Sequence, residues 1–229
     1  MSESAHFNQR FEADGFCIAP DLFSPAECDA LKVEAARVMK EHARPNATVY
    51  VGVSIVSPIY RDLAGDGRLV ARLKSIMPGG VMFLSDKFVV KNAAQRFATP
   101  WHIDAAYWPN TRPKLSVWIP LDDASERNGT LTVVRGSHLK SFDHQHSAGE
   151  QTNGEFNNVI AAKQWSKEDE ITCNVSRGTA IFFSDRLVHG SCASAAGEER
   201  CAIINTYHAP AADDEFDRHF AARRVLVAG

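Results

Sequence analysis

Two histidines and one aspartate have the residue types and spacing that a mononuclear metal site needs. His102 and Asp104 form an H-x-D pair, and residues i and i+2 of a β-strand point to the same face, so both side chains can reach one ion. His189 follows the apolar residues 180–183 and a turn, and a strand returning beside the first would supply it as a third ligand. Two imidazoles and one carboxylate leave coordination positions open, which suits an iron(II) oxygenase that binds O2 there.

Arg200 and Ser191 are candidates for binding a second reactant beside this metal. A strand entered after the turn at residues 193–197 brings Arg200 back toward His189, and Ser191 shares the face of His189 if its strand is regular. A guanidinium binds a carboxylate through two hydrogen bonds, so Arg200 would anchor the far end of a dicarboxylate such as 2-oxoglutarate. Two alternatives remain open: H-x-D pairs also arise by chance, and Arg200 stands beside two glutamates as an exposed arginine would.

Composition restricts the class of protein. The chain has 229 residues, 45% of them hydrophobic, which is enough for one core, and its net charge is -3 without a basic cluster, so nucleic acid is not expected as a partner. No apolar run approaches the roughly 18 residues of a membrane span, and the N-terminal residues lack the apolar region of a secretory signal. Five cysteines without a CxxC pair indicate reduced thiols. We expect a soluble, cytoplasmic protein.

The pattern along the chain predicts helices first and strands later. A short helix precedes a strand at residues 15–19, and Ser24-Pro25 with Glu27 begins a helix that runs to about residue 42. A second helix is expected near residues 68–76. Short β-rich runs follow at residues 81–91, 115–121, 130–134, 171–175, 179–183 and 201–208. Strands of this length separated by Gly, Asn and Pro favour an antiparallel sandwich or barrel. Residues 141–169 read as a long loop, and residues 213–229 as a tail that closes with a helix.

Four blocks of sequence, in order, resemble the phytanoyl-CoA dioxygenase family of iron(II)/2-oxoglutarate oxygenases over nearly the whole chain. The blocks are FEADGFCIAPDLFSPAECDALKVEA, SDKFVVKNAAQRFATPWHIDAAYWP, LSVWIPLDDASERNGTLTVVRGSH and GTAIFFSDRLVHGSCASAAGEER. The chain departs from the family where P-G-S-H is RGSH, where G-D is GT and where K-P-P-G is KNAA. None of these changes falls on His102, Asp104 or His189, but the last leaves the 2-oxoglutarate contacts of strand 81–91 open.

The resemblance implies a mainly β fold with flanking helices around a double-stranded β-helix (jelly-roll, cupin-like) core. Residues 1–229 would form one domain, with a helical part at about 1–80, the core at about 81–210 and a tail at 211–229. It implies Fe(II) bound by His102, Asp104 and His189, with O2 and 2-oxoglutarate as further reactants. The expected 2-oxoglutarate contacts are Arg200, Ser191, Lys87 and Lys91, and the expected substrate contacts are Tyr107, Trp108, Trp118 and Asn205.

The implied reaction is hydroxylation, or a related oxidation, of a small molecule with release of succinate and CO2. Relatives that halogenate have a small residue where this chain has Asp104, so the carboxylate favours hydroxylation. The absence of a basic cluster for a CoA phosphate favours a free metabolite or natural-product intermediate over an acyl-CoA. Two other classes stay open: a cupin-like metal protein that uses no 2-oxoglutarate, and a non-catalytic binding or sensor protein on the same fold.

Overall fold

The computed structural model describes residues 3–108, 111–146, 158–195, 198–210 and 224–227. Its first third is mostly helical. The elements there are α1 (Glu3–Asp14), β1 (Phe16–Ala19), α2 (Pro25–His42), β2 (Val49–Val51), α3 (Val53–Val56), α4 (Pro58–Ala64) and α5 (Gly67–Ile76). Helix α2 begins where the sequence predicts, because the Ser24 side chain and backbone exchange hydrogen bonds with Glu27 in a capping box. The N-terminal part thus supplies helices and one strand at each end of the large sheet described next.

Six strands and the short β2 form a large antiparallel sheet in the order β1-β10-β5-β12-β3-β13, with β2 also paired to β3. Its other strands are β3 (Val81–Lys91), β5 (Lys114–Pro120), β10 (Ala180–Ser184), β12 (Arg200–His208) and β13 (Arg224–Val227). The long strands β3 and β12 are paired from Arg200 opposite Lys91 to His208 opposite Met82, with a register shift between Thr206 and Tyr207. Neighbouring strands in this sheet are therefore far apart in the sequence. This is the pattern of a jelly roll, whereas in a meander each strand pairs with the next one along the chain.

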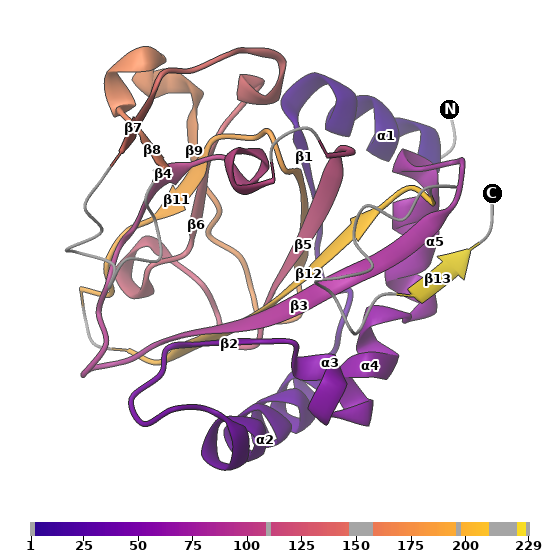
Figure 1. Ribbon diagram of the computed structural model, residues 1–229, viewed down its shortest axis with the longest axis vertical. Coiled ribbons are helices and arrows are strands. Elements are labelled where there is room, and N and C mark those ends of the chain that lie inside the picture. The colour runs from indigo at the N-terminus through magenta and orange to yellow at the C-terminus, as the bar shows by residue number, and fades with distance from the viewer. Residues whose placement is uncertain (1–2, 109–110, 147–157, 196–197, 211–223, 228–229) are drawn as a thin grey trace.

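A small antiparallel sheet faces the large one, in the order β4-β11-β6-β9. Its strands are β4 (Thr99–His102), β6 (Leu131–Val134), β9 (Glu170–Thr172) and β11 (His189–Ser191). In Figure 1 it lies above the long diagonal strands β3 and β12, and helices α2, α3 and α4 lie below them. A two-stranded ribbon of β7 (His144–His146) and β8 (Asn158–Ile160) lies next to β4.

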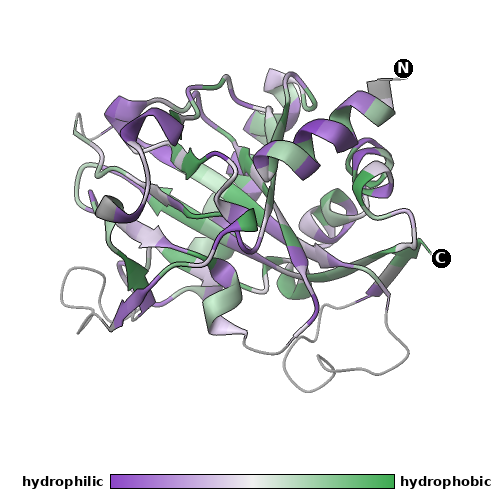
Figure 2. Cartoon of the chain, turned by 90° about the horizontal axis from the view of Figure 1, so that it is seen from above, coloured by the Kyte–Doolittle hydropathy of each residue, from purple (hydrophilic) through white to green (hydrophobic). Residues whose placement is uncertain are grey.

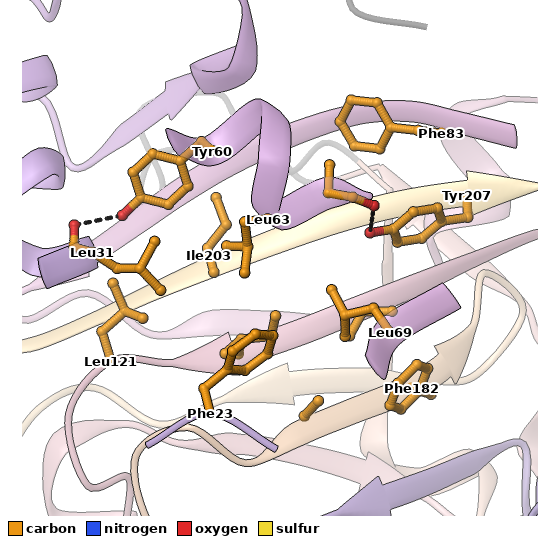
Figure 3. Packing of buried hydrophobic residues seen from close by; sticks show 14 of the residues in the cluster. Phe23, Leu31, Tyr60, Leu63, Leu69, Phe83, Leu121, Phe182, Ile203 and Tyr207 are labelled. Atoms are coloured by element: carbon orange, nitrogen blue, oxygen red, sulfur yellow. Dashed lines mark hydrogen bonds between the residues drawn. The ribbon is translucent and has the colours of Figure 1, made fainter. Parts of the chain in front are cut away.

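The large sheet buries both of its faces, one under the helices and one against the small sheet. The helix side holds the larger cluster of apolar residues, including Phe23, Phe182 and Ile203, and the buried hydroxyls of Tyr60 and Tyr207 donate to carbonyls of Leu31 and Ala64 (Figure 3). The side between the sheets has a smaller cluster with Trp118, Leu131, Phe183 and Ala202 among its members. Figure 2 shows the central strands mostly green and the outer helices with both colours, as one-sided burial requires.

Several sequence expectations are confirmed and others are wrong. The helices at 24–42 and 68–76 and the six strand runs are present within a few residues. The loop expected at 141–169 contains β7 and β8 in its described part, because backbone pairing can form without an apolar pattern when both strands are three residues long. In the tail expected to be helical, residues 224–227 form strand β13 on β3; residues 213–223 lie outside the described residues. Helices α3 and α4 and strand β2 were not foreseen.

Two further observations bear on the class of protein. All five cysteines are free, and four of them are buried, in agreement with the expected absence of disulfides. None of the helices in the described part of the chain has both the length and the apolarity that a membrane span requires.

Candidate active site

His102, Asp104 and His189 come together at one end of the space between the two sheets. His102 ends β4 and His189 begins β11, and the two residues are directly opposite each other in the pairing of these strands. The Nε2 atoms of His102 and His189 lie 3.5 Å and 3.8 Å from Oδ1 of Asp104. One potential ligand atom from each residue lies within 4.8 Å of the others, so the three residues are able to hold one metal ion.

Asp104 reaches this cluster by a different route from the one expected. The strand ends at His102, and Asp104 is the first residue of a 3-10 helix, η1 (Asp104–Tyr107). The Ala105 amide donates to the carbonyl of Asp185 at 2.9 Å, which fixes the chain where it turns out of the strand. The expectation that His102 and Asp104 share a strand face was therefore wrong in its reason, although both side chains do face the same point.

Hydrogen bonds behind the two rings decide which nitrogen faces the metal position. Nδ1 of His102 lies 2.8 Å from the Pro100 carbonyl, and Nδ1 of His189 lies 2.9 Å from the Leu187 carbonyl. A carbonyl only accepts, so each Nδ1 carries the proton and each Nε2 presents a lone pair toward Asp104. Each accepting carbonyl belongs to the residue two positions before the histidine, so the local backbone fixes the tautomer that a metal requires.

The ionisation of His189 and Asp104 also fits a metal. Burial lowers the pKa of His189 to about 4, with a further contribution from His102, so the ring is neutral at pH 7. Burial opposes ionisation of Asp104, but the two imidazoles and the charge of Lys87 bring the pKa of this carboxyl below its ordinary value. The Ser116 hydroxyl lies 3.4 Å from Oδ2 of Asp104, on the side away from the rings. Neutral imidazoles and an ionised carboxylate are the states that bind a divalent cation.

Arg200 is buried at the start of β12, with 2% of its surface exposed. Its Nη2 donates to the Gly129 carbonyl at 3.1 Å, and its guanidinium lies 5.5 Å from the centre of the Trp118 ring. Its Nε and Nη1 are buried and have no hydrogen-bond partner among the described residues. Burial lowers the pKa of Arg200 to about 10, so it remains charged at neutral pH. The alternative of an exposed arginine is excluded, and two charged donors remain available for an anion.

Lys91 and Ser191 lie next to Arg200. Lys91, which is opposite Arg200 in the sheet, is fully buried and donates to Ser191 Oγ and to the Cys192 carbonyl, both at 2.7 Å. Burial, and the charge of Arg200, lower the pKa of Lys91 to about 7. Gly129 makes room for this lysine, because a Cβ at its φ of +77° would lie 2.7 Å from Nζ. Lys91 is thus behind Ser191 rather than on the cavity wall, and it holds the Ser191 hydroxyl in place.

A cavity of about 380 Å³ connects the metal cluster with Arg200 and Ser191. Of the expected contact residues, Lys87, Tyr107, Trp108 and Trp118 also line it. Asn205 does not: alternate residues of β12 face opposite sides of the sheet, and Asn205 is 1% exposed and donates to the Tyr207 hydroxyl on the helix side. The expectation for Asn205 was wrong because Asn205 and Arg200 are an odd number of residues apart on β12 and therefore face opposite sides of the sheet.

The sequence expectations missed Val49 and Phe97 on one wall of the cavity. Val49 and Val51 of β2 line it beside Lys87 and Val89 of β3, to which β2 is paired. Phe97 adds a further apolar contact, and its ring lies 5.1 Å from Lys91 Nζ. The residues Val49-Tyr50-Val51 before Gly52 are of types that favour a strand. Three residues are nevertheless too few for the sequence alone to distinguish a strand from a loop.

These observations define the class of site: two imidazoles and a carboxylate for a metal, and a buried cation with free donors, face one cavity in an antiparallel β-sandwich. The two unpaired donors of Arg200 fit a dicarboxylate cosubstrate. Buried charged donors without hydrogen-bond partners are costly, and a bound carboxylate would supply those partners. The imidazoles of His102 and His189 and the carboxylate of Asp104 fit a divalent metal ion in the same way, because their potential ligand atoms lie close together.

The family model for phytanoyl-CoA dioxygenase (PhyH) matches residues 11–201. The chain belongs to this family. It is 25% identical over 226 residues to an L-proline trans-4-hydroxylase of Streptomyces griseoviridis, which covers 87% of this chain and 84% of the relative. It is also 25% identical over 235 residues to an ectoine dioxygenase of Bordetella parapertussis, covering 90% of this chain and 75% of the relative.

Solved structures show the same fold. The epimerase SnoN in complex with Fe3+, alpha ketoglutarate and nogalamycin RO matches with a TM-score of 0.74 and 20% identity, over 89% of this chain and 82% of SnoN. EctD from S. alaskensis with 2-oxoglutarate and 5-hydroxyectoine matches with a TM-score of 0.72 and 21% identity, over 91% and 76% of the two chains. Family, fold and the His-Asp-His cluster together make this protein a 2-oxoglutarate-dependent dioxygenase that acts on small molecules.

Proposed function

We propose that the protein hydroxylates a small free metabolite, with Fe(II) held by His102, Asp104 and His189 and the distal carboxylate of 2-oxoglutarate bound by Arg200 and Ser191. The observation that carries this proposal is the pair of unpaired Arg200 donors in the cavity that the three ligand candidates also line. When bound, iron and 2-oxoglutarate supply the activation of O2, with succinate and CO2 as products alongside the oxidised substrate.

The protein's own contribution is position and charge. Backbone carbonyls hold both imidazoles with Nε2 toward the metal, so little reorganisation is needed when the ion binds. Lys91 holds the Ser191 hydroxyl and adds positive charge beside Arg200, which stabilises a bound carboxylate. The carboxylate of Asp104 occupies the third ligand position, which supports hydroxylation over halogenation.

Substrate contact is proposed for Tyr107, Trp108 and Trp118. The Tyr107 hydroxyl contacts the backbone of Asn158 in β8, and the Trp108 ring lies 4.8 Å from Lys114 Nζ, so both rings are held on the cavity wall. A cavity of about 380 Å³ is at the small end of ligand sites, and it must also admit 2-oxoglutarate. A compact metabolite, like the proline and ectoine named for two relatives, fits better than an acyl-CoA. The five free cysteines support a cytoplasmic location.

Anaerobic titration with Fe(II) and then 2-oxoglutarate tests this proposal. We expect a visible charge-transfer band that requires both components and saturates at one equivalent of each. His102→Ala should abolish the band. Iron binding without any effect of 2-oxoglutarate would instead indicate a cupin-like protein that does not use this cosubstrate, and no iron binding would indicate a non-catalytic binding protein.

A further inference from the structure

Lys87 is a cation on the cavity wall that the proposed metal and cosubstrate contacts do not use. It lies on β3, lines the cavity, and has no hydrogen-bond or ion-pair partner among the described residues. Pairing places it in one row across the large sheet with Ile204 and Val51. Both neighbours are apolar and also line the cavity, so neither compensates the charge of Lys87.

Lys87 is separate from the group that surrounds Arg200. It stands four residues from Lys91 on the same strand, which is about 13 Å at the rise of a β-strand. Lys87 lies instead in the row of the sheet next to Ser85, Thr206 and Ser116, and the Ser116 hydroxyl lies 3.4 Å from Oδ2 of Asp104. Lys87 therefore faces the end of the cavity where oxidation would occur, rather than the end where Arg200 has free donors.

The balance of charges in the cavity indicates the charge of the ligand group that would bind beside Lys87. Its charged lining residues are the cations Lys87 and Arg200 and the carboxylate of Asp104. A ferrous ion and the dianion of 2-oxoglutarate cancel each other, and Lys91 lies behind Ser191 at the Arg200 end of the site. The residues that line the cavity therefore retain one positive charge. Lys87 is partly buried, and a ligand bound beside it would displace the water that solvates its ammonium. A single anionic group on that ligand would compensate the lost solvation.

We propose that the substrate is a small carboxylic acid with an apolar skeleton, whose carboxylate pairs with Lys87 while its carbon atoms contact Val49, Val51 and Val89. This inference rests on the proposed function. A carboxylate carries the one negative charge that the site lacks, whereas a phosphate monoester would carry nearly two. The valines give a wall without hydrogen-bonding groups, which suits hydrocarbon next to the ion pair.

Matched acids and amides test the proposal with a binding readout. The probes are cyclopentanecarboxylic acid and cyclohexanecarboxylic acid, each against its primary amide, titrated anaerobically into the protein loaded with Fe(II) and 2-oxoglutarate. Perturbation of the charge-transfer band gives the Kd, and succinate release in air gives a second readout. We expect at least one acid to bind the wild type at least tenfold more tightly than its amide. Lys87→Met should reduce that ratio to about one, and Lys87→Arg should retain it.

The matched control is Lys167→Met, because Lys167 is exposed and pairs only with Glu170. It should leave the acid preference unchanged. Amides that bind as well as acids, or no response to either acid, would overturn the proposal. So would a rise in the 2-oxoglutarate Kd of Lys87→Met as large as that of an Arg200 variant, since Lys87 would then serve the cosubstrate. Failure of the wild type to form the iron-cosubstrate band would instead refute the proposed function itself.

Discussion

Replacing Arg200 by methionine should separate the stability of the fold from the affinity for 2-oxoglutarate. Burial lowers the pKa of Arg200 from 12.5 to about 10, which corresponds to a cost of roughly 3 kcal/mol for keeping the side chain charged. The variant loses the hydrogen bond to the Gly129 carbonyl and the contact with Trp118, together worth about 2–4 kcal/mol. These terms nearly cancel, so the free energy of unfolding without ligand should change by no more than about 1 kcal/mol, or about 4 °C in Tm.

The affinity for 2-oxoglutarate should fall far more in the same variant. Two charge-assisted hydrogen bonds from Nε and Nη1 are worth about 3–4 kcal/mol, so the Kd should rise by about 10²–10³-fold. Urea unfolding of the ligand-free protein and anaerobic titration of the iron-cosubstrate band measure the two quantities. Arg127→Met, at an exposed arginine paired with Glu198, is the control and should change neither. A loss of more than about 3 kcal/mol of stability with an unchanged Kd would show that Arg200 is a structural ion and refute this reasoning.

Three further predictions concern the metal, a buried acid and a helix cap. His189→Gln should prevent the iron-cosubstrate band from forming while circular dichroism stays unchanged; a full band would remove His189 from the ligand set. Burial raises the pKa of Asp86, whose carboxylate accepts from the Ser54 amide, to about 6. An acid with a raised pKa stabilises the fold below its unfolded value of 3.8 and loses that contribution as the pH rises through 6. The unfolding free energy of the wild type should therefore fall by up to about 3 kcal/mol relative to Asp86→Asn between pH 4 and pH 8, and parallel pH curves would contradict this. Ser24→Ala removes the capping box with Glu27 and should cost about 1 kcal/mol in urea unfolding, whereas Ser24→Asp should cost less; equal losses would mean that the cap is not the cause.

The order of elements in this chain was more accessible from sequence than the contacts between them. Ser24, Pro25 and Glu27 mark a helix start through local hydrogen bonds, and strands β3, β5, β10 and β12 have enough β-branched and aromatic residues to be visible. Elements of three or four residues, such as β2 and α3, depend on pairing with distant segments and have no periodicity of their own. The closing strand β13 depends in the same way on β3.

The candidate site shows the same division. The three metal-ligand candidates and Arg200 could be chosen because the chemistry restricts their residue types. The position of Lys91 behind Ser191, and of Asn205 on the far side of β12, depended on burial and strand parity. Asp104 illustrates the limit most clearly, since its side chain reaches the cluster although the strand assumed to carry it ends at His102.

The division of the site between two sheets has a consequence for the order in which the protein matures. His102 and His189 belong to strands of the small sheet, and Asp104 directly follows one of them. Arg200 and Lys87 belong to strands of the large sheet. With only one sheet assembled the proposed dicarboxylate site would also be incomplete, because Ser191 belongs to β11 of the small sheet and Arg200 to β12 of the large one. The proposed site for iron and cosubstrate would therefore be complete only when both sheets are in place, so activity should appear late in refolding, with the last tertiary contacts.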